Sequence, residues 1–150
     1  MKKIIVLILS IFLFQSCYFG AGVVEVDLPD SYFLFGNNSI DETAVFFETG
    51  EYSSDVIVEE TVFAIGFNKK FIIAKSYTNN SKFMFEDKNP EILNGIQEDD
   101  LISYHILDLR EKNPKKSKGM NFTEYVKKRR DLKISEKLNF TIILKENTIK

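Results

Sequence analysis

The feature that most limits the possible folds is a pair of apolar runs joined by three residues. Residues 61–67 and 71–76 are separated only by Asn68-Lys69-Lys70. A connection this short cannot hold a crossover helix, so the two runs predict an antiparallel hairpin. Asn68 can adopt the positive φ that tight hairpin turns often require. Because both runs are nearly continuous in apolar side chains, we expect the hairpin at the centre of a sheet, buried on both faces.

Segments with strand patterns lie on both sides of this hairpin. Val24 and Val26 alternate with Glu25 and Asp27, which is typical of a strand with one buried face. Further strands are expected at residues 31–35, 43–49, 55–59, 82–85, 101–109 and 138–144. The connections that precede the hairpin are too short for crossover helices. The pattern therefore predicts an antiparallel meander of about six to eight strands.

Two helices complete the predicted fold. Residues 90–97 begin with a proline at the first helical position, which predicts a short helix before the 101–109 strand. Asn121 and Glu124 have the spacing of a capping box at the start of an amphipathic helix. The predicted buried face of this second helix consists of Phe122, Tyr125, Val126 and Leu132. Strands followed by a helix and a last strand predict an α+β fold with a mainly antiparallel sheet.

The first seventeen residues have the order of a secretory signal. Two lysines precede an apolar run at residues 4–14, which is shorter than the roughly 20 residues of a permanent membrane span. Ser16 and Cys17 close the run, and Cys17 is the only cysteine of the chain. This arrangement resembles the signal of bacterial lipoproteins, in which a small residue precedes an obligatory cysteine. It departs from that pattern at Phe14, where the family usually has leucine.

The resemblance implies that residues 1–16 are removed and that the sulfur of Cys17 carries a diacylglycerol. The alternative is that Cys17 closes an ordinary signal without lipid. Residues 17–22 then form a short lipidated tether, and residues 23–150 form one α+β domain. A single cysteine allows no intramolecular disulfide, so packing must stabilise the domain. The implied location is the bacterial cell envelope, at the periplasmic face of the outer membrane or the outer leaflet of the plasma membrane.

Several core stretches carry a second resemblance. Residues 62–68, 71–75 and Tyr104-His105-Ile106-Leu107-Asp108 resemble an uncharacterised family of small bacterial lipoproteins. Members of that family continue from the signal into a Leu-Pro-x-x-Tyr-x-Leu strand, matched here by residues 28–34, and later have a short amphipathic helix like residues 121–130. The family is a domain of unknown function. The resemblance therefore implies a fold and an envelope location, and it implies no activity.

Acidic and basic residues are divided between two parts of the chain. Residues 17–109 hold 17 acidic and 5 basic residues, a net charge of −12, whereas residues 110–150 hold 13 basic and 5 acidic residues, a net charge of +8. Such asymmetry often accompanies a nucleic-acid or membrane partner. An exported protein seldom meets nucleic acid, so no nucleic-acid partner is expected. We interpret the asymmetry as attraction between parts of one fold plus a solvated basic face, with contact of residues 112–130 to anionic headgroups or envelope polymers left open.

The side chains that carry chemistry are few. His105 is the only histidine and there is no second thiol, so no catalytic residues, no cofactor and no metal site are expected. We interpret His105 as a hydrogen-bonded core or edge residue rather than a catalytic base. Carboxylates cluster at residues 59–60, 86–87 and 98–100, where they could hydrolyse glycosides or bind calcium, but solvated turns are the favoured interpretation. The phenylalanines are interpreted as core rather than as a sugar-binding platform.

Taken together, the sequence predicts a membrane-anchored cell-envelope lipoprotein that is not an enzyme and serves as a protein-binding or structural module. One alternative is an envelope hydrolase that uses clustered carboxylates. Another is an inhibitor or immunity lipoprotein that blocks an enzyme through an exposed edge strand or loop. The expected partners are the membrane, through the lipid at Cys17, and a protein of the envelope. The oligomeric state is left open.

Overall fold

The computed structural model describes residues 24–36, 42–59, 61–78 and 101–144. Within these ranges the chain forms eight strands and one helix near the C-terminus, and all strand pairs are antiparallel. The elements are β1 (Val24–Asp27), β2 (Tyr32–Gly36), β3 (Ala44–Gly50), β4 (Ser53–Val58), β5 (Val62–Phe67), β6 (Phe71–Tyr77), β7 (Ile102–Asp108), α3 (Phe122–Asp131) and β8 (Ile142–Ile143). The predicted fold class and strand number are confirmed. The helix expected at 90–97 and the strand expected at 82–85 lie outside the described residues.

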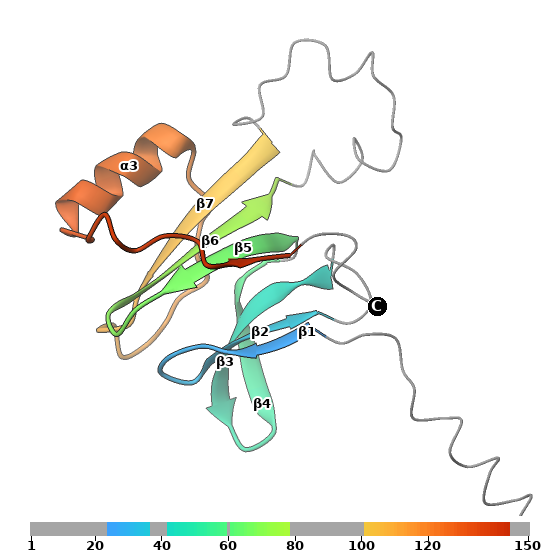
Figure 1. Cartoon of the computed structure of the whole chain (residues 1–150). Coiled ribbons are helices and arrows are strands. Elements are labelled where there is room, and N and C mark those ends of the chain that lie inside the picture. Colours follow the sequence, from blue (N-terminus) through green and yellow to red (C-terminus); the bar gives the residue numbers. More distant parts are fainter. Residues whose placement is uncertain (1–23, 37–41, 60, 79–100, 145–150) are drawn as a thin grey trace, which may run out of the picture.

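The strands form two sheets rather than one continuous meander (Figure 1). Sheet A has the order β1-β2-β3-β4, and sheet B has the order β7-β6-β5-β8. The chain passes from one sheet to the other just before Thr61, whose φ of 74° is unusual for a β-branched residue. The buried Thr61 hydroxyl donates to the Tyr77 carbonyl at 3.0 Å, and the Thr61 carbonyl accepts from the Tyr77 amide at 3.1 Å. These two bonds fix the crossing against the end of β6.

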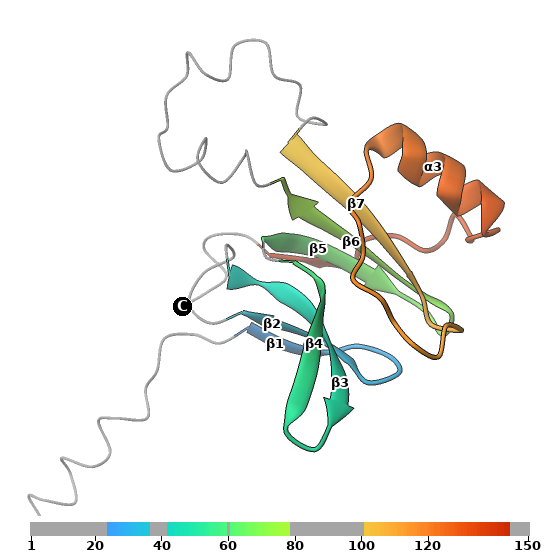
Figure 2. The ribbon, with the colours of Figure 1, turned by 180° about the vertical axis from the view of Figure 1, so that it is seen from behind.

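Two apolar cores hold the layers together. The first lies between the sheets and contains Leu34, Val45, Val58, Val62, Ile65 and Ile72. The second lies between the outer face of sheet B and the segment that contains α3, and it contains Ile73, Tyr104, Ile106, Tyr125, Ile134 and Leu138. Sheet B is thus covered on both sides, which explains why β5 and β6 are apolar on both faces (Figure 2). The prediction of a central, doubly buried hairpin is confirmed.

The predicted turn of this hairpin is wrong in its detail. Asn68 is not among the described non-glycine residues with positive φ. Its side-chain oxygen instead accepts hydrogen bonds from the amides of Lys70 at 2.8 Å and Phe71 at 3.0 Å. The side chain, rather than a left-handed backbone, closes the turn, which is a common use of asparagine at such positions.

Helix α3 begins as predicted but buries less of its apolar face. The Asn121 side chain accepts from the Glu124 amide at 2.9 Å, and the Glu124 carboxylate accepts from the Asn121 amide at 3.1 Å, completing the capping box. On the helix only Tyr125 is buried, where it stacks on Tyr104 of β7 with ring centroids 4.8 Å apart. Phe122 and Val126 remain 47% and 38% exposed. The expected buried face is therefore confirmed for Tyr125 and in part for Leu132, which packs against the second core, and it is wrong for Phe122 and Val126.

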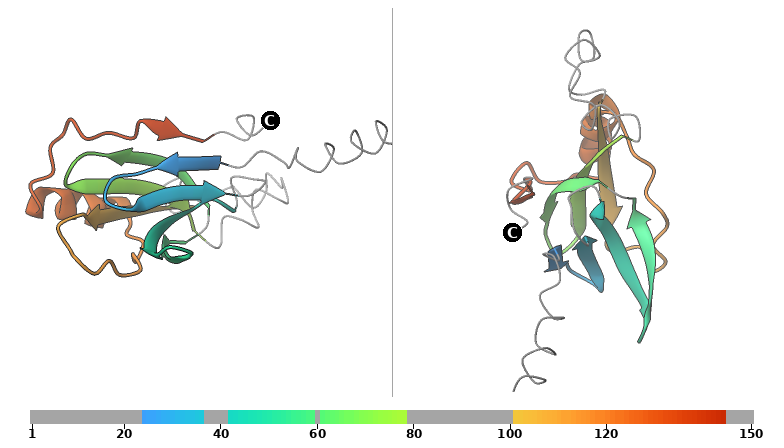
Figure 3. Two further views of the ribbon diagram at one scale, coloured as in Figure 1. Left: turned by 90° about the horizontal axis from the view of Figure 1, so that it is seen from below. Right: turned by 90° about the vertical axis from the view of Figure 1, so that its right-hand side faces the viewer.

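The last strand is shorter than predicted. Regular pairing with β5 is confined to β8, although Thr141 and Leu144 each donate one further backbone hydrogen bond to β5. The inward alternation of Leu138, Phe140, Ile142 and Leu144 is confirmed by burial. None of the described helices is both long enough and apolar enough to span a bilayer. β1 begins at the end of the sandwich that lies away from α3 (Figure 3).

Candidate functional site

The basic loop at residues 111–119 is an ordered strap that joins the edges of the two sheets. The Ser117 amide donates to the Ile57 carbonyl of β4 at 2.7 Å. Met120 exchanges two backbone hydrogen bonds with Tyr104 of β7, at 2.8 and 3.0 Å. We call residues 111–120 the strap. Because β4 and β7 are edge strands of different sheets, the strap holds the sandwich together along one side.

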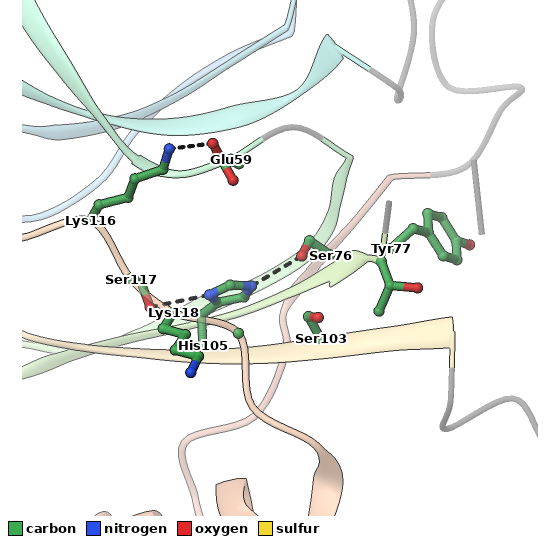
Figure 4. A pocket seen from close by; sticks show the side chains of 10 residues that line it. Glu59, Ser76, Tyr77, Ser103, His105, Lys116, Ser117 and Lys118 are labelled. Carbon is green, nitrogen blue, oxygen red and sulfur yellow. Dashed lines mark hydrogen bonds and ion pairs between the residues drawn. The ribbon is translucent and has the colours of Figure 1, made fainter. Parts of the chain in front are cut away.

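His105 lies on the inner face of β7 beneath the strap and is 5% exposed. Its Nε2 atom is 3.0 Å from the Ser76 hydroxyl of β6, and its Nδ1 atom is 3.1 Å from the Ser117 hydroxyl of the strap (Figure 4). Both ring nitrogens therefore have a hydroxyl partner. The histidine connects a central strand of sheet B to the strap.

Burial lowers the pKa of His105 to about 4. The ring is neutral at pH 7, so one nitrogen donates and the other accepts. A ring with so low a pKa is a weak general base at neutral pH. Its two partners are hydroxyls and not carboxylates, so nothing in this cluster stabilises an imidazolium as the aspartate of a serine-protease triad does. The geometry suits a neutral hydrogen-bonded link better than the activation of Ser76.

A polar pocket of about 410 Å³ opens beside this cluster. Its lining consists of Glu59, Ser76, Tyr77, Thr78, Ser103, His105, Lys116, Ser117, Lys118 and Gly119. At its rim Lys116 forms an ion pair with Glu59, which joins the basic and the acidic part of the chain. Gly119 passes so close to β7 that a Cβ atom there would lie 2.8 Å from the Ser103 side chain.

The outer face of sheet A carries a second candidate surface. The strand register places Phe33 and Phe35 of β2 on the same face as Phe46 of β3 and Val56 of β4. Phe33 and Phe46 stack with ring centroids 5.3 Å apart, and Phe35 meets Phe46 edge to face at 6.2 Å. The three rings are half-buried, Val56 is 40% exposed, and neither apolar core includes them. We call these four residues the aromatic face.

Carboxylates border the aromatic face on two strands. Glu25 and Asp27 of β1 stand opposite Phe35 and Phe33 in the register, and Glu48 follows Phe46 by two residues on β3. The three acidic side chains and Phe33 line a hollow of about 230 Å³. Neither ion pair found among the described residues involves these carboxylates. The surface thus combines apolar rings with an exposed negative rim.

Residues 29–146 match the model of a family described as "Protein of unknown function (DUF3997)". The chain belongs to this family. No curated protein and no solved structure matches it. Membership confirms the resemblance to a domain of unknown function and assigns no activity, while the lipoprotein signal stays a prediction. The DUF3997 match includes His105, the strap and the aromatic face, and it excludes β1 and Cys17.

Some residues singled out in the sequence are not placed by the structure of this DUF3997 chain. Cys17, Glu60 and the carboxylate runs at 86–87 and 98–100 lie outside the described residues. Glu59 is placed, in the ion pair with Lys116. Within residues 24–36, 42–59, 61–78 and 101–144, no group of three or more acidic, histidine or cysteine side chains is arranged to hold a metal ion.

Sequence reasoning missed two parts of the candidate site. Ser76 and Ser117 were not singled out, although the pairing of Ala74 with His105 in the β6–β7 register brings Ser76 within reach. The interpretation of the phenylalanines as core is wrong for the aromatic face. β2 is apolar on both sides, and only its Tyr32 and Leu34 side points into the core. Acidic side chains alternate with apolar ones along β1, and this alternation was the signal that indicated which side of the sheet faces outward.

Proposed function

We propose that this DUF3997 chain is a lipid-anchored envelope lipoprotein that acts as a non-enzymatic protein-binding module through its aromatic face. The observation that carries the proposal is the contiguous apolar surface of Phe33, Phe35, Phe46 and Val56, which no other described element covers. Contiguous apolar surface with a polar border is typical of sites that bind proteins.

The chemistry of this surface selects the kind of partner. Aromatic rings offer a large contact area and lose little conformational entropy on binding. The carboxylates of Glu25, Asp27 and Glu48 favour a partner with lysine or arginine around its own apolar contacts. The aromatic face therefore fits a protein surface that presents apolar side chains among basic ones.

The anchor places this surface near the membrane. β1 begins at Val24, seven residues after the predicted lipidation site at Cys17. A fully extended chain of that length spans at most about 25 Å. The lipid and the aromatic face then act together: the first holds the domain at the membrane surface and the second binds a partner there.

A photo-crosslinking residue at Val56, incorporated in growing cells, tests the proposal. We expect a discrete adduct that disappears when Glu25 and Asp27 are both replaced by lysine, because the reversed charges repel a basic partner. The same crosslinker at Lys112, an exposed position on the strap, is the matched control and should not give this adduct. A Val56 position without any adduct, or an adduct that is indifferent to the charge reversal, would contradict the proposal.

A second candidate function is an inhibitor or immunity lipoprotein. The β3–β4 hairpin projects from the sandwich (Figure 1), and Tyr52 at its tip is 94% exposed. A projecting hairpin with an exposed aromatic side chain at its tip has the shape of a segment that enters an enzyme cleft. The crosslinker placed at Tyr52 distinguishes the two, because an inhibitor gives its strongest adduct at the hairpin tip and a face-binding module gives it at Val56.

A further inference from the structure

A second uncovered surface lies on the opposite side of the molecule. A groove of about 620 Å³ runs between α3 and the residues that follow it. The apolar side chains that line it are those of Phe122, Tyr125, Val126 and Ile134, and the cationic ones are those of Arg129, Arg130 and Lys133. Ser135 and Glu136 complete the lining. We call this the α3 groove.

One cation of the α3 groove is held in place by neighbouring groups. The Arg129 guanidinium donates to the carbonyls of Ser135 and Leu138, both at 2.9 Å, and lies 5.6 Å from the centre of the Tyr125 ring. Arg130 and Lys133 are exposed beside it. The groove therefore pairs the half-exposed Phe122 and Val126 with a positive rim, which is the reverse of the charge pattern around the aromatic face.

The two surfaces match in apolar character and are opposite in charge. Each offers half-exposed apolar side chains, one set bordered by the carboxylates of Glu25, Asp27 and Glu48 and the other by cations of the C-terminal segment. Among the described residues, two ion pairs join the strongly acidic 17–109 segment to the basic 110–150 segment: that of Lys116 with Glu59, and that of Arg110 with Asp108, its near neighbour in the chain. Attraction within one molecule therefore uses little of the charge asymmetry.

We propose that the aromatic face of one copy of this chain docks into the α3 groove of a second copy. The inference rests on the proposed binding role of the aromatic face and names its partner. Phe122 and Val126 supply the apolar contacts, and Arg130 and Lys133 meet the carboxylates of β1. Because the two surfaces differ, the contact is head to tail and leaves one free surface at each end of a pair.

The arrangement of the layers permits this contact between membrane-anchored copies. α3 covers the outer face of sheet B and the aromatic face is the outer face of sheet A, so the two surfaces lie on opposite broad sides of the sandwich (Figures 1 and 3). β1 begins at one end of the sandwich, so copies that stack by translation, without rotation about the stacking axis, have all their β1 starts on the same side. Confinement to a membrane raises the local concentration, which lets a weak contact form rows.

Charge-reversal variants of the full-length lipidated protein, purified in detergent, test the inference by analytical ultracentrifugation. The face variant carries Glu25→Lys and Asp27→Lys, and the groove variant carries Arg130→Glu and Lys133→Glu. All four positions are exposed, so both variants should fold. We expect the wild type to associate in low salt, with weaker association in high salt, and each variant alone to associate at least about tenfold more weakly.

Mixing the two variants gives the sharpest outcome. The intact acidic face of the groove variant still fits the intact cationic groove of the face variant, and the two reversed surfaces are again opposite in charge. An equimolar mixture should therefore regain association that each variant alone has lost. The control variant carries Lys112→Glu and Lys115→Glu on the strap, which is the same change of charge as in the groove variant but at a different place. It should leave association intact. Self-association is overturned if the wild type stays monomeric, if the groove variant associates like the wild type, or if the mixture forms no pairs.

The result separates the inference from the proposed function. A monomeric wild type together with a charge-dependent Val56 adduct to a different protein overturns self-association and leaves the binding role standing. A Val56 adduct with the mass of two copies, mapped to α3 by peptide analysis, supports both. A monomeric wild type without any Val56 adduct overturns both.

Discussion

His105 shows how much one residue can join in a fold of this size. Its ring connects the Ser76 hydroxyl of β6 to the Ser117 hydroxyl of the strap. That a lone histidine on an apolar strand would be buried and hydrogen-bonded could be predicted from the sequence. Its partners could not, because Ser76 becomes a neighbour only through the β6–β7 register and Ser117 only through the path of the strap.

The low pKa of His105 predicts a stability that falls in mild acid. The unfolded chain binds a proton at the ordinary histidine pKa of 6.5, whereas the folded chain does so only near pH 4. The stability that the neutral His105 ring contributes is therefore fully present above pH 6.5. It is lost as the pH falls from 6.5 to 4, which lowers the free energy of unfolding by about 3 kcal/mol. Urea unfolding at pH 7 and pH 4 measures this change.

The His105→Gln variant is the control for this pH dependence. Glutamine does not titrate, so the variant should be less stable at pH 7 but should lose less free energy of unfolding between pH 7 and pH 4. Other groups that titrate in acid, such as Asp108, whose pKa is lowered by its hydrogen bonds with Arg110, act equally in both proteins. Equal pH dependence of the two proteins would refute a role for His105 protonation.

Among the elements, the strap depends on a close backbone approach to β7. At Gly119 a Cβ would lie 2.8 Å from both the Cβ and the hydroxyl of Ser103. Gly119→Ala should therefore push the strap away from β7 and lower the free energy of unfolding by about 1–3 kcal/mol. Thermal and denaturant unfolding measure the loss.

Gly50→Ala is the matched control for the strap. A Cβ there would meet only the Ser53 hydroxyl, at 3.0 Å, in an exposed hairpin. Its effect should stay within about 0.5 kcal/mol. Equal stability of the Gly119 and Gly50 variants would show that the close approach of the strap to β7 is not needed.

The elements also differ in how well local sequence predicts them. The start of α3 was predictable because its capping box needs only Asn121 and Glu124. The burial of its apolar side chains was not, because the line of contact with β7 decides it. In the same way β2 is apolar on both sides, and only the pairing of the strands determines that Tyr32 and Leu34 point inward and Phe33 and Phe35 outward.

At the scale of the whole molecule, the strand patterns and short connections predicted an antiparallel fold with a C-terminal helix. The division into two sheets was not predictable, because a short connection looks the same in the sequence whether the next strand joins the same sheet or begins a second one. Thr61, with its left-handed backbone next to β5, marks the change. A threonine does not predict a left-handed backbone, since β-branched residues rarely adopt this conformation.

The predicted anchor belongs to this scale as well. Cys17→Ala should move the protein from the membrane to the soluble fraction and abolish its metabolic labelling by fatty acid, because the sulfur is the predicted attachment site. Gly22→Ala, in the same segment, keeps the thiol and should keep both membrane association and label. Labelling that persists without the thiol would rule out Cys17 as the lipidated residue.

The position of β1 has a mechanical consequence. It is a four-residue edge strand that pairs only with β2, and a pull on the chain ahead of Val24 loads it first. In an antiparallel hairpin such a pull separates the backbone hydrogen bonds one after another rather than all at once. Since Glu25 and Asp27 are the part of the negative rim that β1 provides, tension would remove these charges from the aromatic face, together with Val24 and Val26 at the border of the first core, before it reaches the buried side chains of either core. Force along the predicted tether would thus act on the proposed binding surface before it unfolds the domain.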